Sequence, residues 1–144
     1  MIISMPKQIH FYSSFKKQGQ EEYNDLITFS YSNVDILIVC FSIASPTSYA
    51  NIRQAWMREI SKSRYSDVPI MLVGTKMDLR DDPKVIEDLA RQNQAPITKD
   101  QGELLAREIN AVKYMECSAL TKVGLQEMFL QVHRIVFPEL EEHI

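Results

Sequence analysis

Two long apolar runs, at residues 34–41 and 68–75, are the clearest pattern along the chain. Almost every position in them is apolar and many are β-branched, which is typical of strands buried on both faces of a parallel sheet. A shorter run of the same kind follows at residues 113–117. We therefore predict that these three runs are strands of one parallel sheet.

Helix signals lie between and after these runs. Ser45 is a typical N-cap residue and Pro46 suits the first helical position, so a helix is predicted over residues 45–64. Thr98 and Gln101, three positions apart, match a capping box at the start of a second helix. The apolar stripe of that second helix is predicted to consist of Leu104, Leu105 and Ile109.

A last helix is predicted over residues 123–137, with Pro138 just past its end. Its apolar face is predicted to consist of Leu125, Phe129, Val132 and Val136.

A small surface helix is predicted between residues 78 and 98, where apolar positions recur at helical spacing, namely Val85, Ile86 and Leu89. Residues 8–15 could form a short strand and residues 21–31 a short helix or loop. The alternation of strands and helices predicts an α/β fold with a parallel sheet.

Composition narrows the class of protein without giving a function. At 144 residues the chain has the size of one domain, and its 45% apolar and 24% charged residues are average for a globular protein. A net charge of −3 without a dense basic run argues against a nucleic-acid partner. The longest apolar run is far shorter than a membrane span, and Cys40 and Cys117 lie in apolar stretches without metal-ligand spacing. We therefore expect residues 1–144 to form one cytoplasmic domain.

The first candidate site follows the second apolar run, which ends in Thr75 and continues with Lys76, Met77 and Asp78. Open α/β sheets bind ligands at this carboxyl edge. A carboxylate there can accept hydrogen bonds from N1 and the exocyclic amino group of guanine, which adenine cannot donate, and a lysine stem can cover the flat ring. Asp78 is predicted to read guanine and Lys76 to clamp it, the alternative being a loop-capping Asp78 and a solvated Lys76.

The second candidate site lies at the end of the third run, where Ser118 and Ala119 precede the last helix. Small residues there let backbone N–H groups approach the carbonyl oxygen of guanine. A plain strand-to-helix turn would also explain this segment. Because both segments follow predicted strands in the expected order, together they favour a guanine site formed by Thr75, Lys76, Asp78, Ser118 and Ala119.

Several longer segments resemble small GTPases of the Rho family, namely "GQEEYNDL", "TKMDLRDD", "PITKDQGELLAREINAVKYMECSALT" and "GLQEMF". The resemblance covers residues 19–138. Thr75, the "LRDD" that follows Met77 and Asp78, and an insert-like segment at residues 82–95 favour Rho over Ras or Rab relatives. The resemblance implies a three-layer, P-loop-NTPase-like parallel sheet, binding of GTP or GDP, and signalling through Rho-type regulators or effectors.

The phosphate-binding half of this family pattern has no counterpart in the sequence. No G-x-x-x-x-G-K-[ST] motif occurs, nothing matches the first switch, and residues 1–18 are divergent, so the fold is expected to be truncated at the N-terminus relative to the family. Lys16 stands where the family has an acidic residue that helps to place Mg²⁺, so Mg²⁺ binding is not expected. Gln20 matches the family's water-orienting catalytic glutamine, but without a phosphate loop we expect no measurable hydrolysis.

Two interpretations of the function follow. The first is a Rho-type guanine-nucleotide-binding protein whose nucleotide binding and hydrolysis are impaired in this chain. The second is a non-catalytic interaction module that binds Rho regulators or effectors, with Tyr23 and Leu26 as candidate anchors. An unrelated flavodoxin-like regulator fits less well because it does not predict both guanine segments. The ending "PELEEHI" has no prenylation box, so we expect no encoded membrane anchor.

The resemblance also predicts a gap in the sheet. In the family, the strand that leads into the phosphate loop lies beside the strand that matches residues 34–41. An open slot there would leave backbone groups without partners and would uncover apolar side chains. We expect either that residues 8–15 pair directly beside residues 34–41, with Ile9 and Phe11 facing the core, or that the isolated chain is partly molten and self-associates.

Overall fold

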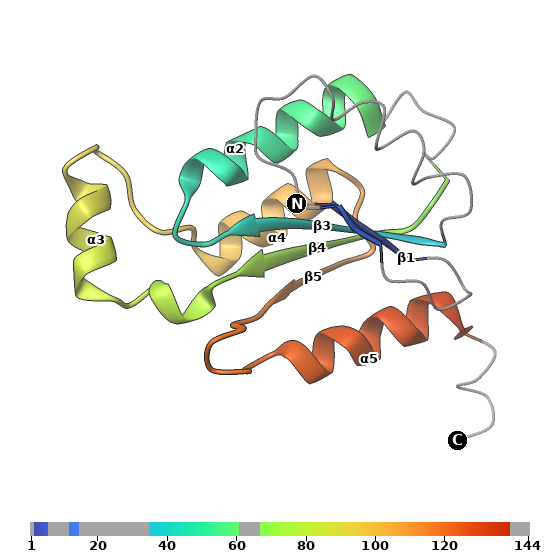
Figure 1. Ribbon diagram of the computed structural model, residues 1–144. Helices are drawn as coiled ribbons and strands as arrows, with labels where there is room; N and C mark the ends of the chain where they lie inside the picture. Colours follow the sequence, from blue (N-terminus) through green and yellow to red (C-terminus); the bar gives the residue numbers. More distant parts are fainter. Residues whose placement is uncertain (1, 6–11, 15–34, 61–66, 139–144) are drawn as a thin grey trace.

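The computed structural model describes residues 2–5, 12–14, 35–60 and 67–138, and it shows a sheet between layers of helices (Figure 1). Its strands run in the order β2-β1-β3-β4-β5. Their bounds are Ile2–Met5 for β1, Tyr12–Ser14 for β2, Ile36–Ser42 for β3, Ile70–Thr75 for β4 and Lys113–Glu116 for β5. The pairs β3 with β4 and β4 with β5 are parallel, which confirms the three predicted strands.

The position beside β3 is filled by β1, not by the predicted segment. β1 pairs antiparallel with β3, from Ile2 opposite Val39 to Met5 opposite Ile36. The prediction that residues 8–15 would pair there is wrong, because the described part of that segment is β2, which pairs with β1 instead. The sequence of β1 is the more apolar and β-branched of the two, which suits a strand between two others, while the more polar β2 lies at the edge of the sheet.

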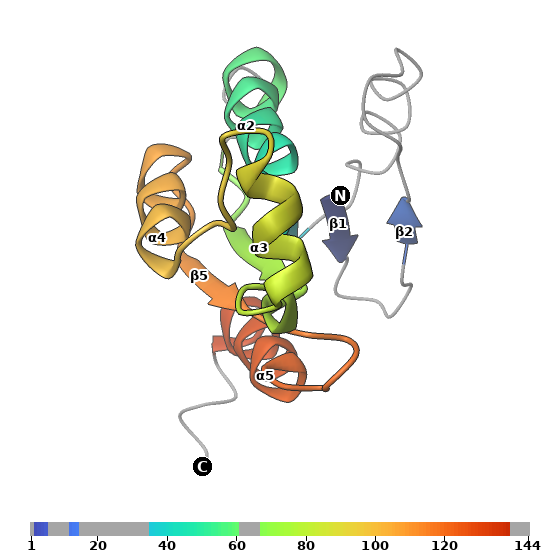
Figure 2. The same cartoon turned by 90° about the vertical axis from the view of Figure 1, so that its left-hand side faces the viewer.

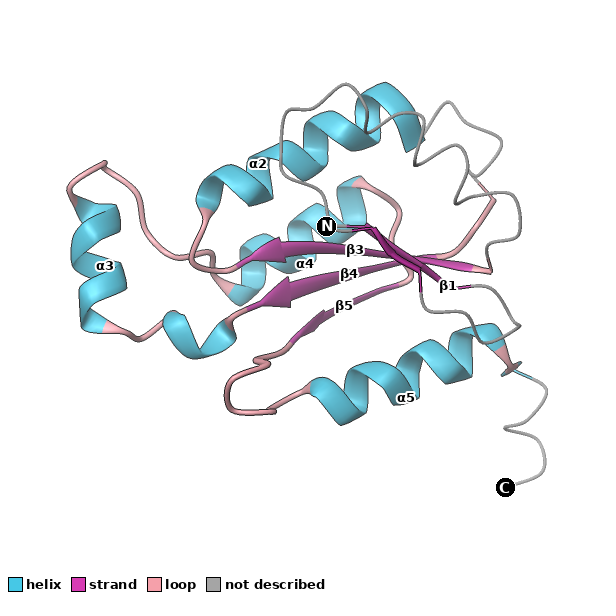
Figure 3. Ribbon diagram, viewed as in Figure 1, coloured by secondary structure: helices cyan, strands magenta, loops and turns pink. Residues whose placement is uncertain are grey.

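Helices cover both faces of the sheet, so the predicted three-layer α/β fold is confirmed (Figure 2, Figure 3). The helices are α2 (Pro46–Ala55), α3 (Pro83–Ala90), α4 (Lys99–Glu108) and α5 (Leu125–Val136). A π-helical turn, η2 (Trp56–Ile60), continues α2, and a single 3-10 turn, η3 (Met77–Leu79), follows β4. Helices α2 and α4 lie on one face, α5 lies on the other, and α3 lies beyond the carboxyl ends of the strands (Figure 1).

Successive side chains of β3 and β4 point to opposite faces of the sheet, so alternate residues belong to different halves of the core. The half under α2 and α4 contains Leu37, Val39, Phe41, Ile70, Leu72, Tyr49, Leu105 and Ile109. The half under α5 contains Ile36, Ile38, Cys40, Met71, Val73, Cys117, Met128 and Val132. No helix in the described ranges has the length and hydropathy needed to span a membrane.

The predicted helix starts are confirmed. The Ser45 side chain accepts a hydrogen bond from the backbone N–H of Ser48 at 3.3 Å, with Pro46 at the first helical position. Thr98 and Gln101 form both hydrogen bonds of a capping box. The surface helix expected between residues 78 and 98 is α3.

Two details of the predicted apolar faces are wrong. Phe129 is 49% exposed and Met128 is buried in its place, because Met128 and Val132 lie on one line of α5 whereas Phe129 is rotated away from the sheet. Leu104 is also 49% exposed, since Leu105 and Ala106 face the core. The expected helix or loop at residues 21–31 lies outside the described residues.

Candidate functional site

The candidate residues come from two neighbouring strands. Thr75 ends β4 and is followed by Lys76 and Asp78, while Ser118 and Ala119 follow β5. Since β4 and β5 are parallel and adjacent, both segments leave the sheet at the same edge. The fold therefore brings together the two segments that the sequence singled out.

The Thr75 hydroxyl is used within the fold. Its Oγ1 donates a hydrogen bond to the backbone carbonyl of Phe41 at 3.0 Å, which ties the end of β4 to β3. The next residue, Lys76, is exposed and has a left-handed backbone with φ 58°. That conformation turns the chain sharply into η3, which carries Asp78.

Asp78 and Ser118 are in direct contact. The Ser118 hydroxyl donates a hydrogen bond to Asp78 Oδ1 at 2.6 Å, and Ser118 itself is fully buried. The same hydroxyl accepts a hydrogen bond from the backbone N–H of Thr121 at 3.1 Å, which fixes its direction. Within the described residues, Asp78 Oδ2 accepts no hydrogen bond. The carboxylate is therefore oriented through Oδ1, which keeps a second lone pair, while both lone pairs of Oδ2 are available to a ligand.

The turn between β5 and α5 presents backbone donors at this edge. Ala119 is exposed, and its N–H donates no hydrogen bond to any described residue. Gly124 has φ +80°, and a Cβ there would collide with the backbone carbonyl of Glu116. Only glycine fits such a position, so Gly124 allows the chain to turn closely over the end of β5 before α5 begins.

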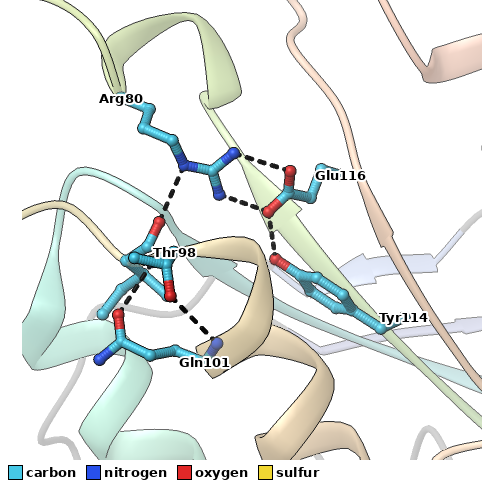
Figure 4. A network of polar contacts seen from close by, with 6 residues as sticks. Arg80, Thr98, Gln101, Tyr114 and Glu116 are labelled. Carbon is cyan, nitrogen blue, oxygen red and sulfur yellow. Dashed lines mark hydrogen bonds and ion pairs between the residues drawn. The ribbon is translucent and has the colours of Figure 1, made fainter.

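A charged network that the sequence analysis did not single out is formed by Arg80, Tyr114 and Glu116 (Figure 4), and Arg80 and Glu116 are each two positions from Asp78 or Ser118. The Arg80 guanidinium makes two hydrogen bonds to the Glu116 carboxylate, at 2.9 and 2.5 Å. Its Nε also donates to the backbone carbonyl of Ile97 at 3.0 Å. The Tyr114 hydroxyl donates to Glu116 Oε2 at 2.6 Å. These contacts link η3, the start of α4 and the end of β5.

The network changes the acidities of its members. Burial acts to raise the pKa of Glu116, but the hydrogen bonds from Arg80 and Tyr114 outweigh it, so this pKa is lowered. Burial and the hydrogen bond to Glu116 raise the pKa of Tyr114. The cluster therefore holds a carboxylate, a guanidinium and a neutral phenol at neutral pH. A glutamate that ends a predicted strand and becomes partly buried requires hydrogen-bonding or charged partners, and this was the only sequence signal for Glu116; nothing in the sequence pointed to Arg80 as its partner.

The predicted catalytic residue Gln20 lies outside the described residues, as do Tyr23 and Leu26. In the described ranges, no three His, Cys, Asp or Glu side chains are grouped so that they could hold a metal ion. The structure thus gives geometry for Thr75, Lys76, Asp78, Ser118 and Ala119 only.

Comparison with known protein families gives a match over most of the chain. The model of the family described as the Ras family matches residues 14–137 of the 144 residues. The matched range includes both segments of the candidate site and the network beside them.

Proposed function

Because the chain belongs to the Ras family, whose members are small GTPases that bind guanine nucleotides, we propose that it is a Rho-type member that selects guanine through Asp78 and Ser118. The observation that carries this proposal is the 2.6 Å hydrogen bond from Ser118 to Asp78 at the shared edge of β4 and β5. It orients a carboxylate whose second oxygen has no partner among the described residues.

Each candidate residue has a separate task in this proposal. The Asp78 carboxylate accepts hydrogen bonds from N1 and the amino group of guanine, while the exposed N–H of Ala119 donates to the carbonyl oxygen of the base. Lys76 is exposed next to Asp78, so its alkyl stem can cover one face of the ring. Adenine has an acceptor at N1 and no amino group beside it, so it cannot satisfy Asp78.

The Rho-type assignment is supported by α3 and by Thr75. Helix α3 lies within the insert-like segment at residues 82–95, begins at the N-cap Asp82 and is exposed beyond the sheet. Thr75 is one of the positions that favour Rho over Ras or Rab relatives, and its hydroxyl donates a hydrogen bond to the Phe41 carbonyl. We further propose one domain over residues 1–144, with the Rho-like region at 19–138, acting in cytoplasmic signalling through Rho-type regulators or effectors.

We also propose that nucleotide binding and hydrolysis are impaired in this chain. The sequence has no phosphate-loop motif, and the position beside β3 holds the antiparallel strand β1. One bidentate base contact supplies about 1–3 kcal/mol, whereas micromolar binding needs about 8 kcal/mol. Base contacts alone therefore support at most millimolar affinity. Without a phosphate cradle, Gln20 has no γ-phosphate to act on.

An interaction module is the second candidate function. It is favoured by α3, whose Ile86 is 43% exposed on a helix that lies beyond the ends of the strands (Figure 1). In that case, regulators or effectors of Rho proteins bind the chain whether or not a nucleotide is present.

Calorimetric titration with guanosine, adenosine and GDP with Mg²⁺ tests the proposed function. We expect weak binding of guanosine, weaker binding of adenosine, and no gain of more than about tenfold from the phosphates and Mg²⁺ of GDP. Micromolar binding of GDP would contradict the proposed impairment. Equal binding of guanosine and adenosine would contradict the guanine site and leave the interaction module as the better account.

A further inference from the structure

Three adjacent links join the segment after β4 to the end of β5. The first is the hydrogen bond from Ser118 to Asp78. The second joins the backbone N–H of Met77 to the carbonyl of Cys117 at 3.1 Å. The third is the ion pair of Arg80 with Glu116. Because these links connect the same two segments, a change in one of them moves the atoms joined by the others.

Burial alone does not hold η3 in place. Its residues, Met77–Leu79, are only partly buried, with Met77 packed against the core, and a single 3-10 turn is not stable by itself. The position of Asp78 therefore depends on the links at its two sides. Of these three links, the Arg80–Glu116 pair is the one that joins two charged side chains, and its two parallel hydrogen bonds fix orientation as well as distance.

The ion pair is itself held rigidly. The Tyr114 hydroxyl binds Glu116, and the Tyr114 ring stacks on Phe41 with centroids 6.2 Å apart and planes at 6°. A Cβ added at Gly74 would lie 2.8 Å from the Tyr114 hydroxyl, and one at Gly102 would overlap the ring. Tyr114 thus fills a slot that two glycines leave open, so Glu116 has little freedom to move.

We propose that Arg80 and Glu116 are positioning residues that set the base selectivity of the guanine site. They do not touch the base. They hold η3 against the end of β5, so that Asp78 and Ser118 keep the separation at which the carboxylate can accept both guanine donors. This inference rests on the proposed function and adds to it the residues that determine its specificity.

Discrimination by a bidentate contact depends on both oxygens being in place. A well-formed contact of this kind discriminates between bases by about 5- to 150-fold. When η3 shifts, one of the two hydrogen bonds to guanine lengthens, whereas weak stacking on either purine is little affected. Loss of the pair therefore lowers the preference for guanine more than it lowers purine binding as a whole.

A second Arg–Glu pair in the chain provides a matched control. Arg53 Nε lies 2.5 Å from Glu108 Oε2, and this pair joins α2 to α4, away from η3 and the end of β5. Its side chains are 41% and 37% exposed, against 26% and 10% for Arg80 and Glu116. Substitutions of Glu108 thus remove the same type of contact without touching either base segment.

The test compares the ratio of adenosine to guanosine dissociation constants, measured by NMR titration, in the unmodified chain and in Glu116→Gln, Glu116→Ala, Glu108→Gln and Glu108→Ala. We expect this ratio to fall by about fivefold or more in Glu116→Ala. It should take an intermediate value in Glu116→Gln, which keeps the shape and one hydrogen bond. Both Glu108 variants should keep the original ratio.

Urea unfolding of every variant separates positioning from general loss of stability. Without ligand, Glu116→Gln should also shift the amide signals of Asp78 and Ser118, which Glu108→Gln should leave in place. An unchanged ratio and unchanged Asp78 and Ser118 signals in a folded Glu116→Gln chain would overturn the inference. Equal binding of the two nucleosides by the unmodified chain would overturn the proposed function and the inference together.

Discussion

Whether Gly102→Ala raises or lowers the stability of the fold tests the packing around Tyr114. Gly102 lies inside α4, where alanine normally stabilises a helix by about 0.5–1 kcal/mol relative to glycine. In this fold, however, an added Cβ would come closer than 3.0 Å to three atoms of the Tyr114 side chain. The local preference and the packing therefore predict effects of opposite sign.

We expect the cost of the packing conflict to exceed the gain in helix propensity. Forcing an extra methyl group into a filled site costs about 1–3 kcal/mol. Subtracting the helix gain of about 0.5–1 kcal/mol leaves a net loss of about 0–2.5 kcal/mol, which lowers the Tm of a chain of this size by at most about 9 °C. The ring cannot simply move away, because its hydroxyl is bound to Glu116 and its face is stacked on Phe41.

Differential scanning calorimetry or urea unfolding of Gly102→Ala measures this effect. As a control, the same substitution in a Tyr114→Val background, where the ring is gone, should stabilise by about 0.5–1 kcal/mol relative to that background. A Gly102→Ala chain that is more stable than the unmodified chain would refute the account of the Tyr114 slot.

Three further predictions concern acidity, thiol reactivity and turnover. The pKa of Glu116 is lowered below its reference of 4.5, so its pairing stabilises the fold above that pH and loses this effect as the pH falls through the lowered pKa. The difference in unfolding free energy between the unmodified chain and Glu116→Gln should be about 1–3 kcal/mol at pH 7 and should narrow in urea titrations from pH 5 to pH 3. A constant difference would contradict the assignment. Burial raises the pKa of Cys40 to about 11, and Cys117 is 5% exposed. A chromogenic disulfide reagent at pH 8 should therefore react slowly with the native chain but rapidly with both thiols of the chain unfolded in urea. Rapid reaction of the native chain would show that this core is open to solvent. Gln20→Leu should leave any GTP turnover in a phosphate-release assay unchanged, and a large drop would show that a working catalytic site forms in another way.

Local signals predicted the parts of the fold that depend on neighbouring residues. The β-branched runs predicted β3, β4 and β5, and the Ser45 and Thr98 caps predicted where α2 and α4 begin. In α5, the face was misjudged by one position because Met128 and Phe129 are both apolar. Only the packing against the sheet decides which of the two is buried.

Pairings between distant segments were not predictable in the same way. The choice of β1 rather than residues 8–15 as the partner of β3 depends on the competition of two short strands for one position. Arg80 and Glu116 are 36 positions apart, so their ion pair becomes visible only when β4 and β5 lie side by side. The meeting of Asp78 with Ser118 was predictable because the ends of adjacent parallel strands share one edge.

The central claim is that the Asp78 carboxylate selects guanine. Its most direct test is the ratio of adenosine to guanosine dissociation constants in the unmodified chain and in Asp78→Asn, measured by NMR titration under the same conditions. We predict a preference for guanosine of about 5- to 150-fold in the unmodified chain and none in Asp78→Asn, because the amide nitrogen replaces one acceptor with a donor. The same ratio in both proteins would contradict the claim.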